Sequence, residues 1–170
     1  MNVRIIIDSS VDIADRFRQD VKIVPLTIHF GEEELIDGLT IDKQRFYERL
    51  VECDELPRTS QANPTAFQKV FEEVTQAGEE AVVITLSSEL SGTFQSACLA
   101  VQDYDNIYVV DSKNAAIGSG ILTEYAIACA KKGMRAREIA EELERKKEDV
   151  CLIALLDTLE YLKRGGRISR

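Results

Sequence analysis

Short apolar runs alternate along this chain with segments of helical period. Four runs are apolar at nearly every position, as strands buried on both faces are: residues 3–7, 81–86, 106–110 and 150–155. A fifth run, 22–30, contains Pro25, which suits an edge strand or a bent segment better than a central strand. This alternation predicts an α/β fold with a mainly parallel sheet flanked by helices on both faces.

The helical segments carry apolar stripes at i, i+3, i+4 and i+7. After Asn63 and Pro64, which suit a cap and a first helical position, one stripe runs to the stop at Gly78 and consists of Phe67, Val70, Phe71 and Val74. The same spacing returns over 94–101 and 136–143. The charged residues opposite the last stripe are expected to form a solvated face.

Residues typical of helix N-termini predict two further helices. Thr40 is predicted to cap a helix that runs to about Cys53. Asp157 with Glu160 resembles a capping box for a short last helix.

Composition and charge exclude several classes of protein. The 170 residues include 45% hydrophobic side chains, enough for the core of one compact domain. The net charge of −9 repels phosphate backbones and anionic lipid headgroups, so we expect neither nucleic-acid binding nor stable membrane insertion. An apolar run such as 151–156 is far shorter than the ~20 residues that cross a bilayer. The N-terminus has no signal-peptide pattern, so a cytoplasmic location is expected.

No metal site is expected. The four cysteines are widely separated, which favours free thiols over zinc ligands or disulfides. Asp8, Asp111 and Asp157 each follow a predicted strand and could together hold a cation, but hard cations need several oxygens in a tight cluster.

Small hydroxyl side chains follow the predicted strands, where α/β sheets bind their ligands. The most specific loop is Ser91-Gly92-Thr93, where a helix is expected to begin. Free backbone N–H groups and the positive end of a helix dipole would meet there, with Gly92 admitting a ligand to the backbone. A second cluster, 58–61, lies before the Asn63 cap. Two such clusters could hold one carboxylate or phosphate, although each is also an ordinary place for helix caps.

Common enzyme signatures are absent from the sequence. His29 is the only histidine and falls in a predicted strand, and there is no Gly-x-Ser-x-Gly motif. There is no Gly-x-Gly-x-x-Gly or Walker motif for nucleotides. The pair Gly118 and Gly120 is expected to permit close helix packing instead.

Five motifs resemble, in order, those of the DegV family. They are Ile-Asp-Ser-Ser-Val-Asp-Ile (7–13), Thr-Ser-Gln-Ala-Asn-Pro (59–64), Ser-Ser-Glu-Leu-Ser-Gly-Thr-Phe-Gln-Ser-Ala (87–97), Val-Asp-Ser-Lys (110–113) and Leu-Glu-Tyr-Leu-Lys-Arg-Gly-Gly-Arg-Ile-Ser (159–169). The family usually has Pro-Ser where this chain has Ala62-Asn63. The resemblance spans the whole chain.

The resemblance implies a non-catalytic protein that binds a long-chain fatty acid and presents it to a fatty acid kinase, which converts the carboxylate to an acyl phosphate. By this resemblance Thr59 and Ser91 hold the carboxylate, and no cofactor is needed. The residues expected to support that site are Ser60, Gly92, Thr93, Asp8, Ser9 and Arg167.

The resemblance also implies two domains with an acyl tunnel between them. Residues 1–160 are expected to form an α/β lipid-binding N-terminal domain. Residues 161–170 are expected to begin the linker to a C-terminal domain that is not in this chain, and without that domain the chain is expected to dimerise. The residues of the hydroxyl-rich loops leave two other hypotheses open. The chain could be an enzyme for a phosphorylated or carboxylated small molecule with Ser91 at its active site, or a structural or regulatory protein without a ligand.

Overall fold

A parallel sheet of four strands forms the centre of the molecule. The computed structural model describes residues 2–53 and 55–168. The sheet has the order β2-β1-β6-β7, with β1 (Val3–Asp8), β2 (Val21–Val24), β6 (Glu80–Thr85) and β7 (Ile107–Asp111). The mainly parallel sheet and three of its four predicted buried strands are therefore confirmed.

The fifth predicted run divides at Pro25. Its first part is β2, an edge strand of the parallel sheet, and its second part is β3 (Thr27–Phe30). β3 lies between β4 (Glu33–Ile36) and β5 (Arg58–Ser60) in a separate antiparallel sheet. Pro25 cannot donate a ladder hydrogen bond, and it stands between the two sheets, where none is needed. The chain therefore has both the edge strand and the bend that this run predicts.

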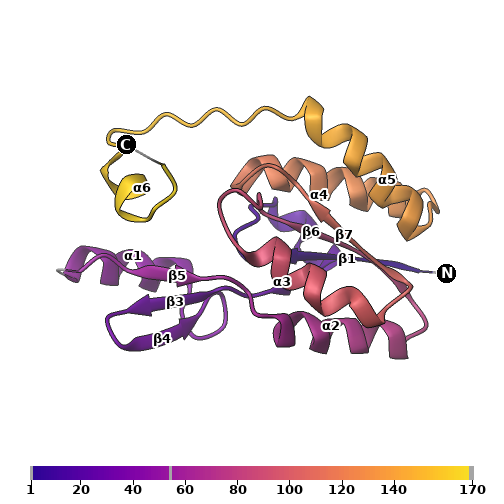
Figure 1. Cartoon of the computed structure of the whole chain (residues 1–170), viewed down its shortest axis with the longest axis horizontal. Helices are drawn as coiled ribbons and strands as arrows, with labels where there is room; N and C mark the ends of the chain where they lie inside the picture. The colour runs from indigo at the N-terminus through magenta and orange to yellow at the C-terminus, as the bar shows by residue number, and fades with distance from the viewer. Residues whose placement is uncertain (1, 54, 169–170) are drawn as a thin grey trace.

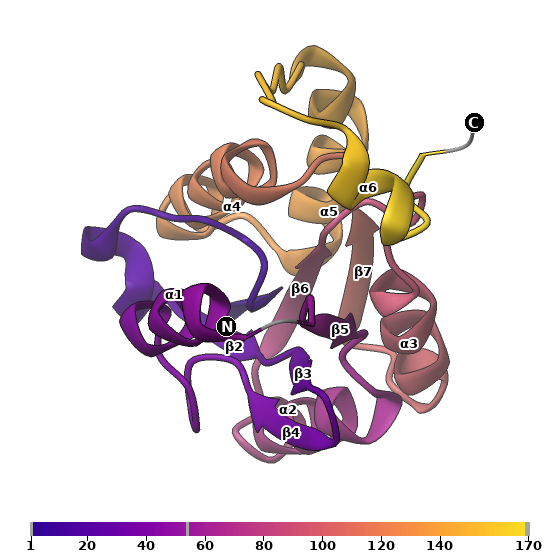
Figure 2. The same cartoon turned by 90° about the vertical axis from the view of Figure 1, so that its left-hand side faces the viewer.

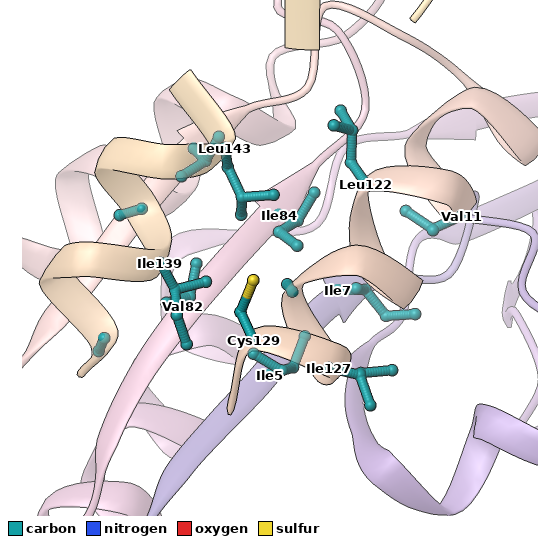
Figure 3. Close-up of a cluster of buried hydrophobic side chains, with 14 residues drawn as sticks. Ile5, Ile7, Val11, Val82, Ile84, Leu122, Ile127, Cys129, Ile139 and Leu143 are labelled. Carbon is teal, nitrogen blue, oxygen red and sulfur yellow. The ribbon is translucent and has the colours of Figure 1, made fainter. Parts of the chain in front are cut away.

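Helices cover both faces of the parallel sheet (Figure 1). α4 (Ala116–Lys131) and α5 (Ala136–Lys146) lie on one face, and α2 (Pro64–Gln76) and α3 (Thr93–Ala100) lie on the other. Side chains alternate along each strand, so Ile5 and Ile7 meet α4 and α5 while Ile6 meets α2. Figure 3 shows the first of these cores, which includes Ile5, Ile7, Val11, Val82, Ile84, Leu122, Ile127, Cys129, Ile139 and Leu143.

The α2 helix has the ends that its sequence predicts. The Asn63 side chain accepts a hydrogen bond from the Ala66 backbone N–H at 2.8 Å, with Pro64 in the first turn. Gly78 follows the last turn with a φ of +66°, a conformation that costs glycine little. The stripe residues Phe67, Phe71 and Val74 are buried.

The antiparallel sheet packs against α1 (Lys43–Glu52) in a small core of its own that contains Ile28, Phe30 and Ile41. The cap of α1 is Asp42 and not the predicted Thr40: Asp42 accepts from the Arg45 N–H at 2.8 Å. The Thr40 hydroxyl instead accepts from the Ile36 N–H at 2.7 Å and closes the preceding turn. The helix ends at Glu52, close to the predicted Cys53.

The predicted strand 150–155 is wrong. Among the described residues this segment has no strand partner, and from Cys151 on its side chains are exposed, with Ile153 87% and Leu155 100% accessible. Figure 1 shows it leaving the end of α5 and crossing to α6 (Glu160–Arg164). An apolar run indicates a surface that favours burial, but a strand also needs a neighbouring strand for its hydrogen bonds. Among the described residues no strand accompanies this segment.

The predicted capping box of α6 is also wrong. The Glu160 N–H donates to the Thr158 hydroxyl at 3.1 Å, and the Asp157 side chain does not cap the helix. The described residues also form 3-10 helices at Asp15–Asp20, Val101–Asp103 and Lys147–Asp149. Within the described ranges, no helix is both long and apolar enough to cross a membrane.

Gly120 allows the close packing predicted from its motif. A Cβ atom at Gly120 would lie 1.9 Å from the carbonyl oxygen of Asp12, so the loop after β1 passes directly against the α4 backbone. The same loop forms a bridge between Val11 and Ala116. The start of α4 is thereby fixed against the end of β1.

Candidate functional site

The carboxyl edge of the parallel sheet presents a row of three polar side chains. Asp8, Thr85 and Asp111 are the last residues of the neighbouring strands β1, β6 and β7. Because side chains alternate, all three lie on the α2 and α3 face of the sheet, and all three are buried. Polar groups therefore underlie the loops on which the sequence places the binding site.

The Ser91 loop leads from this edge into α3. α3 begins at Thr93 with Gly92 as its cap, so the helix start predicted near Ser91 is present. The Ser91 hydroxyl lies 3.0 Å from the Thr93 hydroxyl and accepts from the Thr93 N–H at 3.2 Å. Since the first N–H groups of a helix have no intrahelical partner, this turn combines amide donors, two hydroxyls and the positive end of a helix. It can bind an anion.

The Thr59 cluster lies in a strand. Thr59 and Ser60 belong to β5, where Thr59 is paired with Ile28 and Ser60 with Thr27. α2 starts four residues after β5 ends, with Asn63 as its cap, so the 58–61 cluster precedes a helix start as expected, although Thr59 itself lies in a strand. Thr59 is exposed and shares a face of the antiparallel sheet with its partner Ile28 of β3. Successive strand residues face opposite sides, so Ser60 faces the other way.

Ser60 is bonded to the only histidine of the chain. Its hydroxyl lies 2.8 Å from Nε2 of His29. The other ring nitrogen of His29, Nδ1, is 3.8 Å from Glu34, beyond hydrogen-bond distance. This contact lies on the antiparallel sheet and includes none of the hydrogen-bond partners of Ser91.

Gln61 joins the two predicted clusters, and sequence reasoning missed it. Its side-chain amide donates to the Ser96 hydroxyl of α3 at 2.9 Å. A Cβ atom at Gly92 would lie 1.8 Å from Gln61 Oε1, so the Gln61 side chain fills the space that the missing Gly92 side chain leaves. The segment that follows Thr59 therefore rests on the turn that follows Ser91. Figure 2 shows β5 close to the start of α3. Within residues 2–53 and 55–168, Thr59 and Ser91 share no hydrogen bond.

Asp8 and Ser9 hold the edge of the sheet together. Asp8 accepts from the N–H and hydroxyl of Ser10 at 2.9 and 2.5 Å, and from the Leu86 N–H at 2.8 Å. Burial raises the pKa of Asp8, and these hydrogen bonds oppose that rise only in part. The Ser9 hydroxyl accepts from the Leu26 N–H at 3.0 Å. Both residues shape the loops of the candidate site.

Arg167 lies on the exposed C-terminal segment. Its guanidinium donates to the Gly165 carbonyl at 2.6 Å, and its described hydrogen bonds do not reach Thr59 or Ser91. Ser169, which ends the last family-like motif, lies outside the described residues.

No cluster of three metal-binding side chains occurs in the part of the chain that the structure describes. Asp157 lies in the exposed segment after 150–155, while Asp8 and Asp111 lie in the buried row. The cysteines are free thiols, with Cys129 buried, Cys151 exposed and the other two partly buried.

Thr85 carries a buried hydroxyl without a hydrogen-bond partner among the described residues. An unsatisfied buried hydroxyl costs about 1–3 kcal/mol, so Thr85→Val is expected to raise the free energy of unfolding by about 1 kcal/mol in urea titrations. Thr123→Val is the matched control: Thr123 is equally buried, but its hydroxyl donates to the Ser119 carbonyl at 2.9 Å, so stability should fall. A loss of stability in Thr85→Val would mean that an ordered water satisfies the hydroxyl.

The parallel sheet, its helices and the hydroxyl-lined helix start define an α/β domain suited to an anionic ligand. A family model described as "Uncharacterised protein, DegV family" matches residues 2–170. The chain belongs to the DegV family.

Curated relatives are longer than this chain. A DegV domain-containing protein of Caldanaerobacter subterraneus is 36% identical over 99% of the chain and 61% of its own length. Protein DegV of Bacillus subtilis is 34% identical over 99% of the chain and 62% of its own length. The chain thus spans about three fifths of these relatives.

Solved structures share the fold. DegV of Bacillus subtilis, described as a fatty acid binding protein, superposes with a TM-score of 0.85 at 31% identity, covering 98% of this chain and 61% of that one. A stearic acid-binding protein of Eubacterium ventriosum gives a TM-score of 0.81 at 30% identity, covering 98% and 60%. Fatty acids are therefore bound by members of this family.

Proposed function

We propose that this chain binds the carboxylate of a long-chain fatty acid at Ser91 and Thr59, and that the loaded protein presents the acid to a fatty acid kinase in the cytoplasm. The contact of Gln61 with Gly92 and Ser96 carries this proposal, because it brings the segment after Thr59 onto the helix start at Ser91. The description of relatives of 30–31% identity as fatty-acid-binding proteins supports the ligand class.

The carrier itself is non-catalytic in this proposal. The hydroxyl of Ser91 is bonded to Thr93, and the only imidazole of the chain is bonded to Ser60. Nucleophilic catalysis by a serine requires a base within hydrogen-bond reach. Phosphorylation of the carboxylate is therefore assigned to the kinase, and the alternative of an enzyme with Ser91 as nucleophile has less support.

A C-terminal domain completes the binding site in our proposal, with residues 1–160 as the N-terminal domain and 161–170 as the start of the linker. The greater length of the relatives supports this. So do the exposed apolar side chains of the C-terminal segment, Leu152, Ile153, Leu155, Leu156, Leu159 and Tyr161. Apolar surface of this extent favours a covering partner, or self-association when that partner is missing. The acyl chain would run between the two domains.

Native mass spectrometry tests the ligand. The protein purified from cells with its complete C-terminal region is expected to carry an additional mass of a long-chain fatty acid, which denaturation releases. Adding ATP and a fatty acid kinase should convert that acid to acyl phosphate, whereas free acid without the carrier should not react. An empty protein that hydrolyses test esters would support the enzyme hypothesis instead.

A further inference from the structure

The loop that carries Ser91 is held by the neighbouring loop after β7. Asp111, the last residue of β7, is 5% exposed, and its Oδ1 accepts from the backbone N–H of Ser88 at 3.1 Å and of Lys113 at 3.0 Å. The Lys113 ammonium lies 3.2 Å from Asp111 Oδ2 and donates to the Ser88 hydroxyl at 3.2 Å. Ser88 is thus fixed through both its backbone and its side chain.

Further hydrogen bonds connect the fixed residue Ser88 to Ser91. The Ser87 N–H donates to the Asn114 carbonyl at 2.7 Å, which joins the two loops again. The Ser87 carbonyl in turn accepts from the N–H groups of Leu90 and Ser91 at 3.0 and 3.2 Å. A displacement of Ser87 or Ser88 would therefore move the Ser91 backbone.

The loop after β7 adopts a strained backbone. Lys113 has a φ of +52°, and Ala116, the first residue of α4, has a φ of +45°, in the left-handed region that side chains with a Cβ disfavour. Such residues persist where surrounding contacts over-determine them, and they concentrate at functional sites. In this strained conformation, both the backbone N–H and the side-chain ammonium of Lys113 contact the Asp111 carboxylate.

The charges in this contact reinforce each other. Burial alone would raise the pKa of Asp111, but the hydrogen bonds from Ser88 and Lys113 outweigh it and the pKa is lowered. The hydrogen bond to Asp111 raises the pKa of Lys113. The pair is charged at neutral pH.

We propose that Lys113 is a positioning residue for the carboxylate site: held by Asp111, it fixes Ser88 and, through the 87–91 turn, sets the direction in which Ser91 presents its hydroxyl to the ligand. Because its ammonium is already paired with Asp111, Lys113 acts on the turn and not as an ion-pair partner of the ligand. This inference rests on the proposed function.

The test is equilibrium binding of radiolabelled stearate to Lys113→Asn in the protein with its complete C-terminal region. Asparagine adopts a positive φ more readily than lysine, which offsets part of the stability lost with the ion pair to Asp111, so the unfolding temperature should change little. Its side chain is too short to bridge Asp111 and Ser88. Affinity for stearate should fall roughly five- to thirtyfold through lost pre-organisation, and amide hydrogen exchange should rise at 87–91.

Two further variants separate positioning from general effects. Lys113→Arg keeps a cation of sufficient reach and should restore affinity to within about threefold of wild type. Lys69→Gln removes one positive charge from an exposed position on α2 and should leave binding unchanged.

The outcomes are distinct. Wild-type protein that binds no stearate would overturn the proposed function together with this inference. Wild-type binding with unchanged affinity in Lys113→Asn would overturn this inference alone. Lost affinity without faster exchange at 87–91, or lost affinity in proportion to lost stability with no rescue by arginine, would also overturn it.

Discussion

Replacing Ser91 by alanine is expected to weaken stearate binding roughly ten- to a hundredfold in the protein with its complete C-terminal region. Hydrogen bonds to a charged acceptor contribute about 1.5–3 kcal/mol each, which corresponds to that range of affinity. The Ser91 hydroxyl is partly buried beside the start of α3, where amide donors support a bound anion. Calorimetric titration measures the effect.

Further variants test whether Ser91 and Thr59 bind the same carboxylate. Thr59→Ala should weaken binding to a similar extent, and the double variant should lose less than the two single losses combined, because both hydroxyls serve the same group. Thr65→Ala removes an exposed hydroxyl from the first turn of α2 and should leave affinity unchanged.

The free energy of unfolding of the same variants separates a loss of binding from a loss of folding. The Ser91 hydroxyl accepts from one helix amide, so its loss should cost no more than about 1 kcal/mol of folding free energy. Unchanged affinity in Ser91→Ala would remove Ser91 from the site. A loss of affinity that unfolding of the variant fully explains would also remove Ser91 from the site.

Gly120→Ala is expected to destabilise the fold by about 1–3 kcal/mol, because the new methyl group would overlap the Asp12 carbonyl. Intrinsic helix propensity predicts the opposite sign, since alanine is favoured over glycine by about 1 kcal/mol in a helix interior. To accommodate the methyl group, the loop after β1 must move, which would disturb the hydrogen bond from Asp12 N–H to the Ala116 carbonyl at 3.2 Å.

Gly118→Ala provides the comparison in urea denaturation. Its Cβ would lie 2.5 Å from the side-chain oxygen of Asn114, a side chain that can shift at the cost of its hydrogen bonds to the Ser112 and Val150 carbonyls, whereas the obstacle at Gly120 is backbone. Gly118→Ala should therefore lose less stability than Gly120→Ala. Equal or greater stability of Gly120→Ala than wild type would show that the β1 loop is free to move.

Sequence patterns predict the parallel sheet well and the antiparallel sheet poorly. Strands such as β1 and β6 are buried on both faces, so continuous apolar runs identify them. β5 has only three residues, all exposed, and β4 begins with two exposed glutamates. Such strands form because β3 offers hydrogen-bonding edges, which no local pattern reveals. The 150–155 run shows the converse error, in which apolar residues are present and a partner strand is not.

The candidate site is only partly predictable for a related reason. The Ser91 turn and the Asn63 cap are local signals, and the structure places helix starts beside both. The roles of Gln61 and Lys113 depend on contacts with Gly92 and Ser88, 31 and 25 positions away. Glycine at 92 was the one available hint, since its missing side chain leaves room for Gln61.

The pairing of β1 with β6 also bears on how the chain folds during synthesis. β1 lies between β2 and β6, and its first residue, Val3, pairs with Glu80. Roughly 75 residues must therefore be translated after β1 before its second edge can be covered, which takes about 4–15 s at typical rates. In that interval only β2 can protect β1, so the nascent chain exposes an apolar strand edge of the kind that chaperones bind.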